Sequence, residues 1–168
     1  MQTNAITIGR LSPDLWEMYR DFRFEAVQNT PEAFAVSYEE EFRKTEEQWR
    51  KQIVNMLFAQ SDDKLIGMIG FYSEELEKLS HVASIVSFYV TPSARGQKVG
   101  KQLMDACLSA IRDNPKVRKV ALHVTASRLE AIALYKKFQF EIIGTSREEY
   151  FSDGRYYDQH SMELFIKH

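Results

Sequence analysis

The sequence of 168 residues, with 44% hydrophobic and 27% charged residues, has the length and composition of one soluble globular domain. Its formal net charge of -2 gives no basic surface for nucleic acid, and it shows neither a signal-peptide pattern nor an apolar run that could span a bilayer. The single cysteine, Cys107, suits a helix core in a reducing compartment, and the four histidines show no metal-ligand spacing. We therefore expect a single cytoplasmic domain over residues 1–168, without a nucleic-acid, membrane or metal partner.

The first part of the chain predicts one strand and one helix. Alternating side chains favour a strand over residues 5–11. Ser12 followed by Pro13 is typical of a helix N-terminus, and Pro31 ends the helix that follows. Apolar residues between these two points recur at helical spacing and define one buried face: Leu15, Met18, Tyr19, Phe22 and Ala26.

A second helix is expected to begin at residue 38. Ser37 and Glu40 form a capping box, in which each residue satisfies a backbone N–H near the other. Phe42, Trp49 and Ile53 follow at a spacing that places them on one face of a single helix. We therefore predict one continuous helix that buries these three side chains.

Three strands come next. Asp62-Asp63 predicts a tight turn between strands at 56–60 and 65–72. A run of β-branched and aromatic residues over 82–90 predicts a third strand, which stops before Pro92.

The segment after this strand carries the strongest functional signal. An Arg95-Gly96 turn leads to Gly100 and to an amphipathic helix over 99–112. The first turn of a helix has free backbone N–H groups, and its dipole favours negative charge. The two glycines remove side chains that would keep a phosphate away from the backbone. We therefore predict a phosphate-bearing ligand at this loop.

Two other phosphate-binding motifs fit this loop poorly. A P-loop has a wider glycine spacing, followed by Lys and then Ser or Thr. Gly96 and Gly100 stand one residue closer than that, and Gln102 replaces the hydroxyl. A dinucleotide-binding fingerprint needs a third glycine, which is missing here.

The remaining elements complete an α+β pattern. We expect a strand over 117–125, a helix capped by Ser127 and Glu130, and two strands around a turn at Asp153-Gly154. The order β-α-α-β-β-β-α-β-α-β-β implies a mixed, mostly antiparallel central sheet flanked by helices. The strand–helix–strand unit over 82–125 should be parallel with a right-handed crossover.

Three segments resemble the GNAT acetyltransferase superfamily in their order and spacing. The loop over 95–100 is similar to the family's coenzyme A loop, the helix over 127–140 resembles its Asn-x-x-Ala-x-x-Leu-Tyr-x-x-x-Gly-Phe helix, and residues 150–162 resemble its closing hairpin. The positions that match the helix motif are Ala131, Leu134, Tyr135 and Phe140. The positions that depart from the family, which usually has Gly, Asn and Gly there, are Lys98, Arg128 and Gln139. The resemblance implies the same topology as the element order above.

The resemblance also implies an activity and its site residues. It predicts direct transfer of an acetyl group from acetyl-CoA to a primary amine of a small molecule, with Tyr135 as the acid that protonates the leaving thiolate. A half-buried core tyrosine is the alternative for Tyr135. The Val90 N–H is the predicted oxyanion donor. The residues that would contact the cofactor are Phe88, Tyr89, Val90, Arg95, Gly96, Gln97, Lys98, Val99, Gly100, Lys101, Arg128 and Ala131.

The general base, the acceptor and the oligomeric state stay open. His81, Glu148, Glu149 and a water molecule are alternatives for the base, and His123 is expected on the opposite face of its strand. The family places the loop over 28–37 above the acceptor. The nearby acidic residues favour a cationic amine or simply form a solvated helix face: Glu39, Glu40, Glu41, Glu46 and Glu47.

Two alternatives for the function as a whole also stay open. A protein N-terminal or lysine acetyltransferase is the alternative enzyme. A catalytically silent acyl-CoA sensor is the alternative of another class. Many members of the family are dimers, and the sequence leaves a homodimer open.

Overall fold

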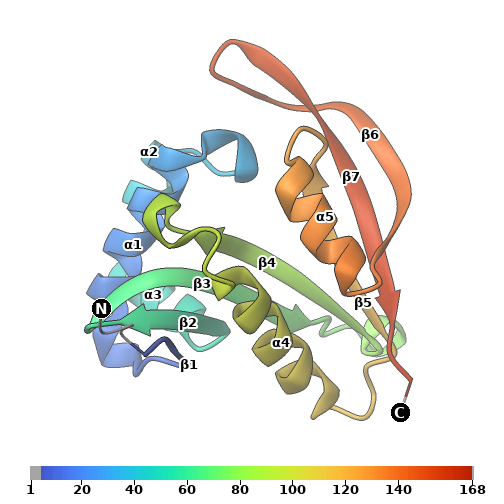
Figure 1. Cartoon of the computed structure of the whole chain (residues 1–168), viewed down its shortest axis with the longest axis horizontal. Helices are drawn as coiled ribbons and strands as arrows, with labels where there is room; N and C mark the ends of the chain where they lie inside the picture. Colours follow the sequence, from blue (N-terminus) through green and yellow to red (C-terminus); the bar gives the residue numbers. More distant parts are fainter. Residues whose placement is uncertain (1–4, 168) are drawn as a thin grey trace.

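A single mixed sheet organises the chain in the computed structural model, which describes residues 5–167. Seven strands lie in the order β1-β2-β3-β4-β5-β7-β6, with helices on both faces (Figure 1). The elements in chain order are β1 (Thr7–Gly9), α1 (Trp16–Asn29), α2 (Tyr38–Phe42), α3 (Glu46–Ile53), β2 (Met56–Ser61), β3 (Lys64–Ser73), β4 (Val82–Val90), α4 (Val99–Arg112), β5 (Lys119–Thr125), α5 (Leu129–Lys137), β6 (Glu141–Ser152) and β7 (Arg155–Phe165). The predicted α+β class with a mixed, mostly antiparallel sheet is confirmed.

One pair of strands is parallel, and α4 connects it. β4 and β5 pair through Val82–Ile85 and Lys119–Leu122, whereas every other neighbouring pair in the described sheet is antiparallel. The parallel unit predicted for this part of the sequence is therefore confirmed.

Among residues 5–167, no helix combines the length and the apolar character needed to cross a membrane.

Each face of the sheet has its own hydrophobic core. α4 packs its apolar face on the sheet through Leu103, Met104 and Leu108, and α5 adds Ile132 to the same core. α1 and α3 cover the other face of β2–β4. Cys107 is buried in the α4 core, as its helical position predicts.

The prediction of a single helix from residue 38 onward is wrong. α2 ends at Phe42, and α3 begins at Glu46 with a capping box of its own, formed by Thr45 and Gln48. Phe42 is 67% exposed and contacts other aromatic rings near α2, so it does not share a buried face with Trp49. Because the helix restarts at Thr45, the acidic residues of this region do not line one helical face.

Three element boundaries also differ from the expectation. β1 covers Thr7–Gly9 and not 5–11, since it is an edge strand that pairs only with β2. β5 begins at Lys119, after a turn in which the Val117 N–H donates to Asn114. Ser127 does not cap α5, because residues 125–128 form a tight turn in which the Arg128 N–H donates to the Thr125 carbonyl.

Candidate functional site

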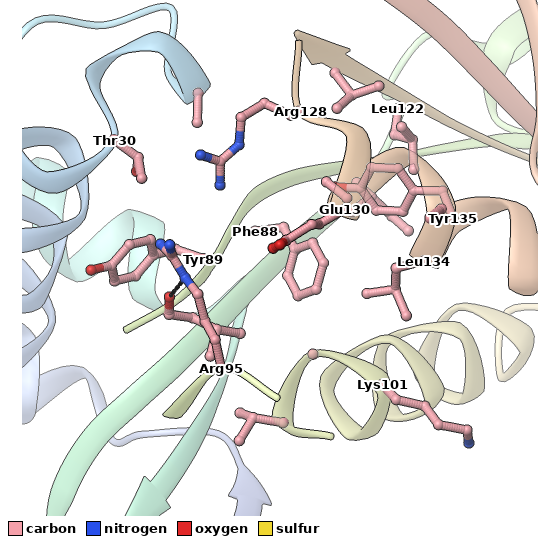
Figure 2. Close-up of a pocket in the computed structure, with 18 of the residues that line it drawn as sticks. Thr30, Phe88, Tyr89, Arg95, Lys101, Leu122, Arg128, Glu130, Leu134 and Tyr135 are labelled. Atoms are coloured by element: carbon pink, nitrogen blue, oxygen red, sulfur yellow. Dashed lines mark hydrogen bonds between the residues drawn. The ribbon is translucent and has the colours of Figure 1, made fainter. Parts of the chain in front are cut away.

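The site lies where β4 and β5 separate. The two strands pair only as far as Ile85 and Leu122, after which β4 continues along β3 and β5 along β7. Figure 1 shows the two strands diverging from this shared start. A pocket of about 850 Å³ opens in the fork, with β4, β5, the start of α4 and α5 around it (Figure 2).

A β-bulge in β4 sets which side chains face this pocket. Ser87 and Phe88 together oppose Ile69 of β3, and Ser87 adopts a left-handed backbone with φ of 56°. An extra residue on one strand reverses the alternation of side chains beyond it. Ile85 faces the α4 core before the bulge, whereas Phe88 faces it afterwards and Tyr89 joins the α1 core.

The bulge also determines the direction of the Val90 backbone. The Thr91 N–H donates to the Ile66 carbonyl at 3.0 Å, so this pair is hydrogen-bonded in the antiparallel ladder. Along such a ladder, successive residues point their backbone N–H and carbonyl groups alternately toward the partner strand and away from it. Val90, next to Thr91, therefore points both groups away from β3 and toward the fork. Its carbonyl accepts a hydrogen bond from Arg95 Nε at 3.2 Å. The N–H therefore faces the fork, and its role as an oxyanion donor stays a prediction.

The loop before α4 has the backbone of an anion site. Gly96 has φ of 77° and Lys98 has φ of 63°, and α4 then begins at Val99. A Cβ on Gly100 would lie 3.2 Å from Phe88 Cζ, so helix and strand approach closely here and a larger residue would have to displace the Phe88 ring. Gln97 is turned away, since its Nε2 donates to the Ser93 carbonyl and it does not line the pocket.

Cations dominate the charged lining of the pocket. The cationic side chains are Arg95, Lys98, Lys101, Arg128 and Lys137. Glu130 is the one carboxylate among the described lining residues. An excess of fixed positive charge around a helix N-terminus favours an anionic ligand such as a phosphate ester. Residues 5–167 contain no group of three or more side chains arranged to hold a metal ion.

Tyr135 reaches the pocket from α5. The side chain is 5% exposed, and its ring centroid lies 5.9 Å from that of Phe88 (Figure 2). Burial raises the pKa of the Tyr135 phenol, which is therefore protonated at neutral pH. No residue within 5–167 forms a hydrogen bond with its hydroxyl, although the residue lines the pocket. The phenol is free to give a proton to a bound ligand.

The segment between α1 and α2 is tied to the other side of the fork through Glu32. Its backbone carbonyl accepts hydrogen bonds from the hydroxyls of Thr125, at 2.6 Å, and of Tyr150. Its carboxylate lies 2.9 Å from Arg128 Nη1. Figure 2 shows the Arg128 side chain extending toward the segment that carries Thr30. The guanidinium predicted to contact the cofactor is thus already paired in this structure, and that contact stays a prediction.

The candidates for a general base lie in different places. His81 precedes β4 at the end away from the bulge, and Glu148 and Glu149 are exposed on β6, so none of them lines the pocket. His123 does line it, and its Nδ1 lies 3.1 Å from Ser161 Oγ. His123 is out of phase with the core-facing residues, as expected, but the pocket passes through the fork and reaches both faces of the sheet there.

The predicted cofactor residues are otherwise brought together. Apart from Gln97, all of them line the pocket, as does Tyr135. Local sequence patterns had identified the loop, the strand and the α5 helix separately. The contribution of Glu32 had no sequence signal, because it depends on the distant residues Thr125, Arg128 and Tyr150.

Comparisons with known proteins agree with this geometry. Residues 13–140 match the acetyltransferase (GNAT) family. No curated protein matches the sequence. The fold is similar to that of a GNAT-family acetyltransferase from Streptococcus pneumoniae, with a TM-score of 0.85, 17% identity, and coverage of 97% of this chain and 100% of that one.

Two further solved structures are similar. A ribosomal-protein-alanine N-acetyltransferase from Brucella melitensis has a TM-score of 0.77 and 22% identity, covering 95% of this chain and 99% of its own. A putative acetyltransferase from Salmonella typhimurium, solved with its cofactor acetyl-CoA, has a TM-score of 0.73 and 14% identity, covering 98% of this chain and 95% of its own. At these identities the likeness establishes the fold.

Proposed function

The chain belongs to the acetyltransferase (GNAT) family, and from this premise we propose that it transfers an acetyl group from acetyl-CoA to the primary amine of a small molecule. The observation that carries the proposal is the composition of one pocket. A cationic loop at a helix N-terminus, a β4 backbone turned into the fork and a buried phenol all open into it.

The residues present fit acetyl-CoA, the cofactor of this family. Arg95, Lys98 and Lys101 with the first turn of α4 would hold its phosphates. The lack of a Cβ at Gly100 leaves the helix N-terminus close to Phe88, so an extended arm could run along β4. When bound, acetyl-CoA supplies an acetyl thioester that an amine can attack.

Three groups of the chain then meet the needs of acyl transfer. The Val90 N–H faces the fork and can donate to a carbonyl oxygen on which negative charge develops. Tyr135 Oη carries the proton that a departing sulfur requires. His123, the imidazole in the pocket, is our candidate for accepting the proton of the amine, and Ser161 holds its Nδ1.

The contacts around Glu32 favour a small acceptor. They join the segment between α1 and α2 to β5, α5 and β6 at one end of the pocket, where a peptide would need an open groove. The likeness to a ribosomal-protein-alanine acetyltransferase keeps a protein N-terminus as the second candidate. A silent sensor is less well supported. Binding alone does not require a buried phenol such as that of Tyr135, whose hydroxyl has no hydrogen-bond partner among the described residues.

The acidic residues of α2 and α3 give little support to a strongly cationic acceptor. Glu40 accepts a hydrogen bond from the Ser37 N–H, and Glu46 pairs with Arg50. Glu41 is fully buried against Arg23. None of the five acidic residues of these helices is among the described residues that line the pocket, so the charge of the acceptor depends on the lining residues.

Ligand-induced stabilisation tests the proposed cofactor site. Acetyl-CoA at about a hundredfold excess over its Kd should raise the free energy of unfolding by about 2.7 kcal/mol and raise Tm accordingly. Charge reversal at the exposed Lys98 and Lys101, as K98E with K101E, should abolish this shift because it places carboxylates against the phosphates. K78E with K116E is the matched control, since it changes the same charge at exposed positions outside the pocket.

Turnover completes the test. Thiol release from acetyl-CoA should depend on an added primary amine, and the best amine in a panel of small amines, amino-acid amides and peptides identifies the acceptor class. An unchanged Tm shift in the folded K98E/K101E variant would refute the assigned cofactor site. A cofactor-induced shift without amine-dependent thiol release would favour the sensor.

A further inference from the structure

Arg23 of α1 and Glu41 of α2 are charged side chains that are buried outside the pocket. Arg23 is 7% exposed and Glu41 is fully buried. Arg23 Nε and Nη2 donate to Glu41 Oε1 at 3.1 and 3.0 Å, and Lys44 Nζ lies 2.8 Å from Oε2. Neither Arg23 nor Glu41 lines the pocket, so the acyl-transfer chemistry described above does not use them directly.

The third nitrogen of Arg23 connects this ion pair to the bulge of β4. Arg23 Nη1 donates to Ser87 Oγ at 2.9 Å. The guanidinium also lies over the Phe34 ring, 4.5 Å from its centroid. One side chain of α1 therefore contacts α2, the bulge, and the segment that carries Glu32. The bulge and the segment that carries Glu32 both contribute residues to the pocket lining, Ser87 and Ala33 among them.

Ser87 needs such a contact because of its backbone conformation. A non-glycine residue at a φ of 56° is strained, and such strain persists only where the surroundings fix it. The bulge at Ser87 is also what turns Phe88 and the Val90 N–H toward the fork. A change at Ser87 Oγ is therefore transmitted to the backbone groups that face the ligand.

We propose that Arg23, held in place by Glu41, is a positioning residue that fixes the Ser87 bulge and thereby aims the Val90 N–H at the reacting carbonyl. This inference rests on the proposed function for its catalytic consequence. A buried ion pair is often no more stabilising than apolar residues of the same volume, so stability alone does not account for it. The geometry of the guanidinium accounts for the ion pair, because one side chain donates to Glu41 Oε1 and to Ser87 Oγ together.

Ser87→Ala tests the proposal with the smallest change. It removes the acceptor of the Arg23 Nη1 hydrogen bond and leaves the ion pair intact. We expect kcat to fall about 10-fold, less than the loss of an oxyanion donor causes, because the donor is misaimed and not removed. KM for acetyl-CoA and the Tm shift that acetyl-CoA induces should stay near wild type, since the substitution does not touch the cationic loop before α4.

A double-mutant cycle separates positioning from general destabilisation. R23M with E41L replaces the buried pair by apolar side chains and should reproduce the fall in kcat, and adding Ser87→Ala to it should cause no further loss. Lys44→Met is the matched control, because it removes the other cation of Glu41 without contacting Ser87, and kcat should be unchanged. Should R23M/E41L not fold, Ser87→Ala against Lys44→Met carries the test.

Amide NMR gives a readout that does not require turnover. In the unliganded protein, Ser87→Ala and R23M/E41L should shift the Val90 and Phe88 amide resonances, and Lys44→Met should not. Wild-type Val90 shifts and wild-type kcat in Ser87→Ala would overturn the positioning role. Shifted amides in a protein that acetylates no amine would support the positioning and count against the proposed function alone.

Discussion

Tyr135 illustrates how a single residue depends on its surroundings. Burial raises the pKa of its phenol, so it holds a proton throughout the neutral range and can act as an acid but not as a base. The sequence motif predicted its place, because the spacing of Ala131, Leu134 and Tyr135 is local to one helix. Within residues 5–167 the hydroxyl has no hydrogen-bond partner. This could not be predicted, because it depends on the separation of β4 and β5.

Tyr135→Phe keeps the ring and removes the proton. If Tyr135 is the acid, kcat should fall roughly 10²-fold at every pH, with KM for acetyl-CoA and Tm little changed. His123→Gln tests the base in a similar way. If His123 accepts the proton of the amine, glutamine cannot replace it, and kcat should fall roughly 10²-fold. Steady-state kinetics of the three proteins make the comparison.

Two outcomes of that comparison would contradict the assignments. A Tyr135→Phe variant that turns over at the wild-type rate, under conditions in which chemistry limits the rate, would return Tyr135 to a purely packing role. A His123→Gln variant with the wild-type kcat would leave water as the base.

The helices and strands show which sequence signals are reliable. Asp62-Asp63 and Asp153-Gly154 both form the predicted hairpin turns, because left-handed residues at two consecutive positions specify a turn locally. The β4 bulge had no comparable signal, since Ser87 is held there by Arg23, 64 residues earlier. The sequence did contain a signal for the break between α2 and α3, the capping pair Thr45 and Gln48. The helical spacing of Phe42, Trp49 and Ile53 extends across this break and therefore predicted a single helix.

The sign of the change in stability caused by Thr45→Ala tests the break between α2 and α3. In the structure Thr45 caps α3, with its hydroxyl accepting from the Gln48 N–H, so alanine should lower the free energy of unfolding by about 1 kcal/mol. In a continuous helix Thr45 would be an exposed interior position, where alanine is the better residue and would stabilise. Urea unfolding measures the difference, and Thr45→Ser, which keeps the hydroxyl, should remain near wild type.

The sheet of the whole molecule consists of two parts that are joined by a short parallel pair. β1–β4 with α1–α3 form one side of the fork, and β5–β7 with α5 form the other. Glu32 joins them at one end of the pocket. A ligand that lies in the fork would contact both sides, which is why ligand binding should stabilise the entire fold and not one segment.

The buried titratable groups predict how the whole fold responds to alkali. Burial raises the pKa of the Cys107 thiol from 9.0 to about 12 and that of the Tyr19 phenol from 10.0 to about 12. Well below pH 9.0 both groups are protonated in the folded and the unfolded chain, so stability should not depend on them. As pH rises toward about 12, the unfolded chain loses these protons first, and the free energy of unfolding should fall by up to about 1.4 kcal/mol per pH unit for each group.

Cys107→Ala isolates the contribution of the thiol. Near neutral pH the variant should be less stable than the wild type, because the smaller side chain leaves a cavity in the α4 core. Its free energy of unfolding should nevertheless fall less steeply than that of the wild type above pH 9.0, since one of the ionising groups is gone. Urea unfolding at a series of alkaline pH values gives both slopes. Parallel slopes would mean that the thiol ionises equally well in the folded chain, and that the α4 core admits water around Cys107.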